Sequence, residues 1–155
     1  MKILFIDPGP KLSGFVVYDG EHLHDRGKYQ NDSLIENPKK IDMLAIEQVR
    51  SYGMAVGAEV FDTVHWSGRF HQLYVWHGIR VDLVTRMDIK MHICKSPRAK
   101  DGNIRQALID RFGQPGTAKN PSPFFREHRF GRMNNDQWQA LAGAVTVFDK
   151  LGGLN

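Results

Sequence analysis

The hydrophobic pattern at the start of the chain predicts three strands. Residues 2–6 are predicted to form a strand, since residues 3–6 are a continuous apolar run typical of a strand that is buried on both faces. A second apolar run covers residues 12–18, and the Asp19-Gly20 pair that follows it is a strong signal for a tight hairpin turn. Residues 21–29 would then pair back as a third, more polar strand. The chain is therefore expected to open with an antiparallel three-strand meander.

A fourth predicted strand repeats the design of the first. The run at residues 2–6 is followed at once by Asp7, and the apolar run in residues 42–49 leads into Glu47. The polar segment between the third and fourth strands, residues 31–40, indicates a loop or a single turn. If the first and fourth strands are parallel neighbours, both acids emerge at the same edge of the sheet. Binding and catalytic sites of α/β folds tend to lie beyond the carboxyl ends of such strands.

The rest of the chain alternates between helical and strand spacing. Apolar residues recur at helical spacing over residues 55–77, and they alternate with polar residues over 79–85. The buried side of the long helix is expected to contain Val56, Val60, Phe61, Val64, Phe70 and Tyr74. The remaining expected elements are a short helix over 86–94, a basic loop over 95–102, a helix over 103–112, an irregular segment over 114–133 and a last helix from an Asn134 cap to about residue 151.

The last predicted helix has two distinct faces. One face is apolar and includes Trp138 and Leu141. The other begins with Asp136 and Gln139 and continues with small residues such as Gly143. Small residues allow a helix to lie close to a sheet. Such a helix would bring Asp136 near the two acids at the strand ends.

Composition is that of an ordinary soluble domain, and we expect residues 1–155 to form one domain. Hydrophobic residues make up 41% of the chain and charged residues 25%. No apolar run approaches the roughly 20 residues that a membrane span needs. The start of the chain lacks a signal-peptide pattern and Cys94 is the only cysteine, so a reducing cytoplasmic location is expected. The net charge of +4 favours an anionic partner such as nucleic acid, but only weakly.

Three separated acids are candidate ligands for a divalent metal, and phosphodiester hydrolysis is one reaction that such a site can perform. That reaction needs an activated water and neutralisation of the charge on the reacting oxygens, and two Mg²⁺ ions about 4 Å apart can provide both. We expect Asp7 to bridge the two ions, while Glu47 holds one and Asp136 the other. Mn²⁺ would substitute for Mg²⁺. Gln139 could contribute a neutral carbonyl, and His128 and Asn135 are weaker candidates. Taken singly, each acid also has an ordinary structural explanation, as a turn residue, a surface acid or a helix N-terminal acid.

Two basic segments are candidates for contact with DNA. The segment over 86–105 is rich in Lys and Arg, and the segment over 114–133 interleaves Arg with Phe. Such segments suit phosphate contacts and stacking on splayed bases, although a solvated surface explains them equally well. The candidate DNA-binding residues are Tyr52, Lys90, Lys95, Arg98, Lys100, Arg126, Arg129 and Arg132.

Three motifs, in this order, resemble those of RuvC-type Holliday junction resolvases. Residues 3–9 with Ser13-Gly14 resemble the opening of that family, residues 45–49 its second acidic motif, and residues 136–146 its C-terminal catalytic helix. The resemblance implies a ribonuclease H-like fold with a five-stranded mixed sheet flanked by helices. It also implies a homodimer and magnesium-dependent nicking of four-way DNA junctions. The dimer surface would lie on the long helix, around residues 61–77, although packing in the core explains the aromatic residues there equally well.

The chain departs from the family pattern at Gln139, where the family carries a second acid on this helix. The chain is therefore expected to belong to a divergent branch of the family, and a phage origin with action in the host cytoplasm would fit it.

Three functions stay open at this point. The first is a structure-selective DNA endonuclease that cleaves Holliday junctions or other branched DNA. The second is another ribonuclease H-like nuclease that acts on RNA or an RNA–DNA hybrid. The third is a non-catalytic branched-DNA binder.

Overall fold

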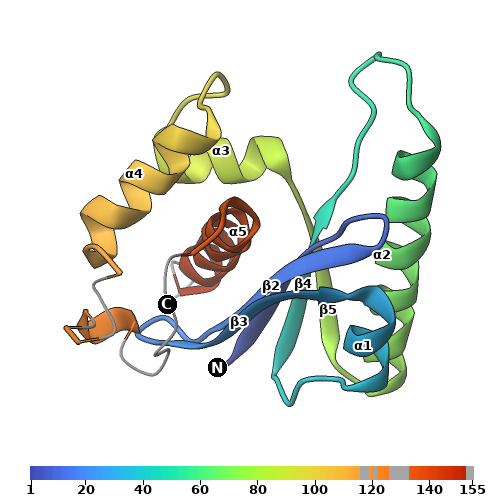
Figure 1. The fold of residues 1–155 in the computed structure, drawn as a ribbon, viewed down its shortest axis with the longest axis horizontal. Coiled ribbons are helices and arrows are strands. Elements are labelled where there is room, and N and C mark those ends of the chain that lie inside the picture. The colour runs from blue at the N-terminus through green and yellow to red at the C-terminus, as the bar shows by residue number, and fades with distance from the viewer. Residues whose placement is uncertain (116–118, 121, 126–132, 153–155) are drawn as a thin grey trace.

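The computed structural model describes the chain except residues 116–118, 121, 126–132 and 153–155. A five-stranded mixed sheet lies between two groups of helices, and α5 crosses one of its faces (Figure 1). The strands are β1 (Ile3–Asp7), β2 (Leu12–Tyr18), β3 (Leu23–Gln30), β4 (Met43–Gln48) and β5 (Arg80–Thr85). The helices are α1 (Asn31–Glu36), α2 (Ala58–Trp76), α3 (Arg86–Cys94), α4 (Asp101–Phe112) and α5 (Asn135–Gly152), with a 3-10 turn, η1 (Pro123–Phe125).

The sheet topology confirms the predicted α/β arrangement. The strand order is β3-β2-β1-β4-β5, in which β1, β2 and β3 form the antiparallel meander. Strands β1 and β4 are parallel neighbours, and their register pairs Ile6 with Ile46. Asp7 and Glu47 are the next residues on the two strands. The two acids therefore lie at the same edge of the sheet, as the sequence predicted.

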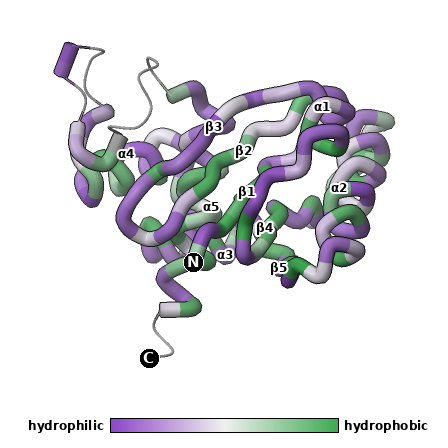
Figure 2. Tube along the Cα trace, turned by 90° about the horizontal axis from the view of Figure 1, so that it is seen from below, coloured by the Kyte–Doolittle hydropathy of each residue, from purple (hydrophilic) through white to green (hydrophobic). Residues whose placement is uncertain are grey.

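Alternation along the central strands divides the core into two layers. On one face Ile3, Phe5 and Ala45 pack against α5, around Trp138 and Leu141. On the other face Leu4, Ile6 and Leu44 pack with Phe70 and Tyr74 of α2. Figure 2 shows that β1 and β2 are largely hydrophobic, while β3 at the sheet edge is more hydrophilic. Asp7 follows Phe5 by two positions and therefore faces α5.

Glycines let α5 approach the sheet closely. A Cβ atom added to Gly143 would overlap the ring of Phe5, so no larger residue fits there without movement. A Cβ atom added to Gly14 on β2 would lie 2.9 Å from Cβ of Asp136. The prediction that small residues bring Asp136 near the strand ends is thus confirmed.

The segment after β3 differs from its prediction. Residues 31–36 form the helix α1 where a loop or a single turn was expected. Its first residue, Asn31, is buried, accepts a hydrogen bond from Ser13 Oγ at 2.6 Å and donates one to the carbonyl of Gly9 at 2.9 Å. The helix is short because Asn37 ends it just before Pro38. The contacts that anchor it come from distant parts of the chain, which explains why local pattern missed it.

The buried side of α2 is narrower than predicted. Phe70 and Tyr74 are buried as expected, but Phe61 and Val64 are exposed, and Val56 is exposed and precedes the helix. The helix packs against β4, β5 and α1. Only a narrow stripe is covered by these elements, so much of its apolar surface faces outward. No helix in the described part of the chain has the length and apolar character needed to cross a membrane.

Candidate active site

The three predicted acids meet at one end of the sheet. Asp7 ends β1, Glu47 stands near the end of β4, and Asp136 lies in the first turn of α5. Burial, together with the negative charges of Glu47 and Asp136, raises the pKa of Asp7 from 3.8 to about 7. The electrostatic coupling shows that the side chains share one site. Arg86 and Lys28 act in the opposite direction on the same carboxyl group.

The turn that follows Asp7 is held by a small buried network. The backbone N–H of Gly9 donates to Ser13 Oγ at 3.2 Å, and Ser13 in turn donates to Asn31. The backbone N–H of Asn31 donates to the carbonyl of Lys11 at 2.9 Å. The network fixes the direction in which the chain leaves β1, and with it the backbone that carries Asp7. Asn31 was not predicted to have this role.

Glu47 is a largely buried acid, and one of its carboxylate oxygens has no hydrogen-bond partner among the described residues. Burial raises its pKa, while the positive charge of Arg86 lowers it. Its Oε2 atom lies 3.5 Å from Nη1 of Arg86 but accepts no hydrogen bond from any described residue. The carboxylate therefore retains an unused lone pair inside the site.

Arg86 is placed by the junction between β5 and α3. Thr85 ends the strand and caps the helix: its side chain accepts from the backbone N–H of Asp88 at 3.1 Å, and Asp88 Oδ2 accepts from the N–H of Thr85 at 3.0 Å. This reciprocal cap fixes the first turn of α3, which Arg86 begins. Its guanidinium contacts both Glu47 and Asp101.

A second basic side chain, Lys28 on β3, forms an ion pair with Asp136. Gly14 is the register partner of both Asp7 and Lys28 in the sheet, so the lysine reaches the site across the glycine. Lys28 was not predicted as a site residue, and Arg86 was predicted only as part of the basic segment over 86–105. Alternation along β3 offered a signal, because Arg26 and Lys28 both face α5, where Arg26 donates to Gln137 at 3.0 Å.

Gln139 lies one helical turn after Asp136 and is only 2% exposed. Its amide nitrogen makes a long contact of 3.5 Å with Asn135 Oδ1. Its carbonyl oxygen is buried and accepts no hydrogen bond from the residues that the structure describes. A buried acceptor without a donor is unfavourable by about 1–3 kcal/mol, so this carbonyl is suited to a cation or a water.

The donor set fits a hard divalent cation. Asp7, Glu47 and Asp136 supply carboxylates, Gln139 supplies a carbonyl, and two of these side chains carry unused buried oxygen atoms. A cation would also relieve the repulsion that raises the pKa of Asp7. Within the described residues, no group of three or more His, Cys, Asp or Glu side chains stands in a preformed metal arrangement. Lys28 and Arg86 instead neutralise the acids, and they would have to yield to a metal.

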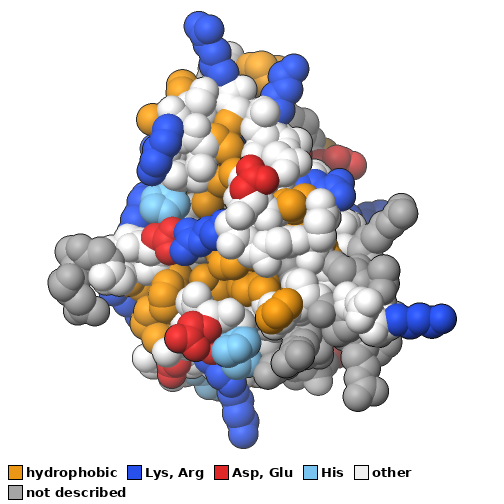
Figure 3. All heavy atoms as spheres, turned by 90° about the vertical axis from the view of Figure 1, so that its left-hand side faces the viewer, with side chains coloured by type: hydrophobic (Ala, Val, Ile, Leu, Met, Phe, Trp, Pro, Cys, Tyr) orange, Lys and Arg blue, Asp and Glu red, His pale blue; other side chains and the backbone are white. Residues whose placement is uncertain are grey.

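The predicted DNA-binding residues have different surroundings. Lys90 on α3 is half-buried, and its charge lowers the pKa of Glu47, so it lies near the site. Tyr52 is 63% exposed, on the segment that follows β4. Three of the predicted residues are exposed on or beside the loop between α3 and α4: Lys95, Arg98 and Lys100. Figure 3 shows Lys and Arg side chains projecting at several points around one face of the molecule. Arg126, Arg129 and Arg132, together with His128, lie outside the described residues.

The strand order β3-β2-β1-β4-β5, with an α-helix across one face of the mixed sheet, is that of a ribonuclease H-like fold. The acids stand at the ends of β1 and β4. Among solved structures, the chain is similar to Thermus thermophilus RuvC. One structure of that protein has 15% sequence identity and a TM-score of 0.71, and the match covers 99% of this chain and 97% of that one. A structure of T. thermophilus RuvC in complex with a Holliday junction substrate has 17% identity and a TM-score of 0.72, with 99% and 96% covered.

The predicted RuvC-like fold is thus confirmed over nearly the whole chain. No protein-family model matches the sequence, and the search of curated proteins finds no match. The likeness concerns the fold.

Proposed function

We propose that this chain is a metal-dependent, structure-selective DNA endonuclease that cleaves Holliday junctions or other branched DNA. The observation that carries the proposal is the convergence of Asp7, Glu47 and Asp136 at one end of the sheet. The acids occur in a fold shared with RuvC, and one of the similar structures is a complex with a Holliday junction substrate.

Asp7, Glu47 and Asp136 would hold the metal, with Asp7 shared between two Mg²⁺ ions and the Gln139 carbonyl available as a neutral ligand. Mn²⁺ would be accepted in place of Mg²⁺. When bound, the two ions supply an activated water and neutralise the charge that develops on the phosphate. The raised pKa of Asp7 is consistent with this role, because a carboxyl group buried beside two other acids needs positive charge to ionise readily.

The basic residues around the acids would bind the DNA backbone. Lys28 and Arg86 neutralise Asp136 and Glu47 in the metal-free chain, and either can turn to a phosphate once metal replaces it. Lys90 is close enough to Glu47 to affect its pKa and would contact the same phosphate region. The exposed ring of Tyr52 would stack on an unpaired base near the site.

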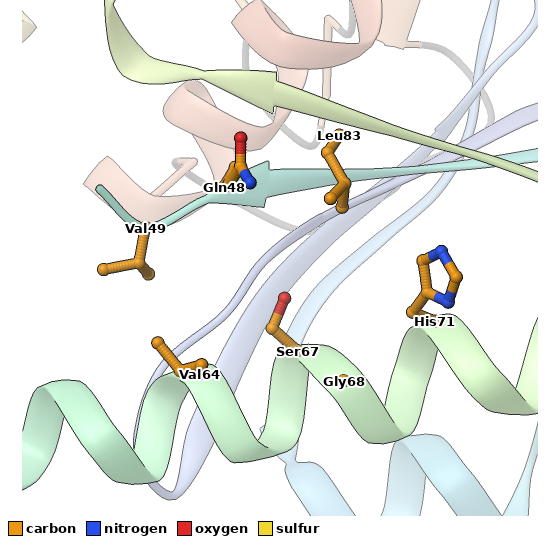
Figure 4. Close-up of a pocket in the computed structure, with 7 residues that line it drawn as sticks. All are labelled: Gln48, Val49, Val64, Ser67, Gly68, His71 and Leu83. Atoms are coloured by element: carbon orange, nitrogen blue, oxygen red, sulfur yellow. The ribbon is translucent and has the colours of Figure 1, made fainter.

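A homodimer would place two such sites on opposite strands of a junction. The outward side of α2 carries large exposed apolar side chains among its polar ones, with Phe61 66% exposed and Trp76 82% exposed. Beside it, a pocket of about 220 Å³ lies between α2 and the ends of β4 and β5, and Figure 4 shows Val64 and Val49 facing each other across it. A large exposed apolar surface of this kind suits a second copy of the chain.

The nuclease proposal is tested with labelled four-way junction, flap, linear duplex and RNA–DNA hybrid, each with and without Mg²⁺. We expect cleavage of the branched DNA in Mg²⁺, and we expect Asp7→Asn to abolish cleavage while junction binding remains. Junction binding without cutting in either Mg²⁺ or Mn²⁺ would refute a nuclease and indicate a DNA-binding protein. Preferred cutting of the hybrid would move the substrate class to RNA.

The dimer is tested by sedimentation of the wild-type chain and of Trp76→Glu. The substitution puts a charge on the exposed face of α2 and should convert the dimer to a monomer. Met91→Glu is the matched control, because Met91 is an exposed apolar residue on α3. A monomeric wild-type chain, or a Trp76→Glu variant that stays dimeric, would contradict the α2 surface.

A further inference from the structure

The three acids of the proposed site carry less negative charge than two divalent cations carry positive charge. Two divalent cations carry four positive charges, and Asp7, Glu47 and Asp136 provide three negative ones. The next inward position of α5 is Gln139, which is neutral. An additional carboxylate must therefore come from another element, or the site must depend on the substrate for its remaining charge.

Asp101, the first residue of α4, is a carboxylate in contact with the site. One oxygen is paired with the guanidinium of Arg86, which also contacts Glu47. The other oxygen accepts a hydrogen bond from Nδ2 of Asn135 at 3.0 Å. The two carboxylates are therefore linked through one guanidinium group, that of Arg86.

The buried amide of Gln139 is an independent sign of a ligand here. Asn135 contacts Asp101 through Nδ2 and Gln139 through Oδ1, so the three side chains form one continuous chain of contacts. At the inner end of this chain, the Gln139 carbonyl oxygen is buried and has no donor among the described residues. The Glu47 Oε2 atom is likewise without a hydrogen bond from that part of the chain.

We propose that Asp101 is a further carboxylate of the metal site, which binds the cation held by Glu47 either directly or through one of its water ligands. The proposal rests on the proposed metal-dependent function. Arg86 shows that one cationic group can contact both carboxylates at once, and its guanidinium occupies that position in the metal-free chain. Metal would replace Arg86 between the two acids, and the Gln139 carbonyl would face the same site. Mg²⁺ retains several waters in proteins, so a second carboxylate can act on it without direct contact.

An alternative role for Asp101 is to position Arg86, with no effect on metal. The two roles differ once Arg86 has been removed. If Asp101 acts on the metal, its loss still weakens metal binding when residue 86 is neutral. If it acts only through Arg86, the same loss has no effect in that background.

The test measures binding of Mn²⁺ alone to the metal-free chain, without DNA, by electron paramagnetic resonance and calorimetry. The variants are Arg86→Gln, Arg86→Gln with Asp101→Asn, and Asp7→Asn. Asp110→Asn is the matched control, because Asp110 is exposed on the same helix and contacts Gln106. We expect Asp101→Asn to weaken Mn²⁺ binding about 10–100-fold in the Arg86→Gln background, as for other groups that support metal ligands. Asp110→Asn should bind like the wild type.

The inference would be overturned if the Arg86→Gln variant and the double variant with Asp101→Asn bound Mn²⁺ with equal affinity. If Asp7→Asn still loses Mn²⁺ in that case, the proposed function stands. Unchanged Mn²⁺ binding by Asp7→Asn, or none by the wild type, would instead refute the metal site and the inference together. Circular dichroism checks that each variant is folded. Asp101→Ser provides a second substitution if Asp101→Asn disturbs the start of α4, since serine is also accepted at helix N-termini.

Discussion

Replacing Asp7 by asparagine should stabilise the metal-free chain while abolishing its activity. Burial and the neighbouring acids raise the pKa of Asp7 from 3.8 to about 7 in the folded chain. A folded state with the higher pKa holds the proton more tightly than the unfolded state, so stability falls as the pH rises between these two values. The gap corresponds to about 4 kcal/mol of unfolding free energy at pH 8. Asparagine has nearly the same shape but carries no charge, so it should recover much of this amount.

The measurement is denaturant unfolding in a metal chelator, followed by tryptophan fluorescence, at pH 4 and pH 8. The stability gain of Asp7→Asn should be near zero at pH 4 and reach about 2–4 kcal/mol at pH 8. Asp62→Asn, an exposed acid on α2, serves as the control and should change stability by less than about 0.5 kcal/mol at either pH. A variant that is no more stable than the wild type at pH 8 would refute the account of Asp7 as a buried acid held under repulsion.

Two further substitutions test how closely α5 approaches the sheet, and a third serves as their reference. Gly14→Ala should displace Asp136, because its Cβ would lie 2.9 Å from that of the acid, and should weaken Mn²⁺ binding and lower the unfolding free energy by about 1–3 kcal/mol. Unchanged values in a metal titration and a denaturant curve would contradict this contact. Gly143→Ala should be at least as destabilising, since the new Cβ overlaps the Phe5 ring. Gly68→Ala is the reference within α2, where no described atom lies within 4 Å, and it should raise stability by about 0.5–1 kcal/mol in the same denaturation experiment.

The strand framework was predictable because its signals are local. A run of apolar residues with an acid at its end defines both β1 with Asp7 and β4 with Glu47. The short helix α3 was predicted with its observed bounds, and the small residues of α5 were correctly associated with close packing. In each case the relevant residues are neighbours along the chain.

The surroundings of the acids depend on contacts between distant segments. Lys28 reaches Asp136 from a strand more than 100 residues earlier, and Asp101 meets Glu47 only through Arg86. A count of basic residues cannot distinguish such pairs from solvated side chains. For α2, helical spacing correctly placed Phe70 in the core, but it could not show how little of the helix the sheet covers.

The register between β1 and β4 has a consequence for how this chain can vary in evolution. Side chains alternate between the two faces of a strand, so one residue inserted or deleted between Met43 and Glu47 would turn the acid away from α5. Apolar exchanges within the strand keep that direction and are tolerated far better. Selection at this site therefore constrains the number of residues in the strand before each acid more strictly than it constrains the identity of those residues. Diverged relatives should be recognised by that spacing.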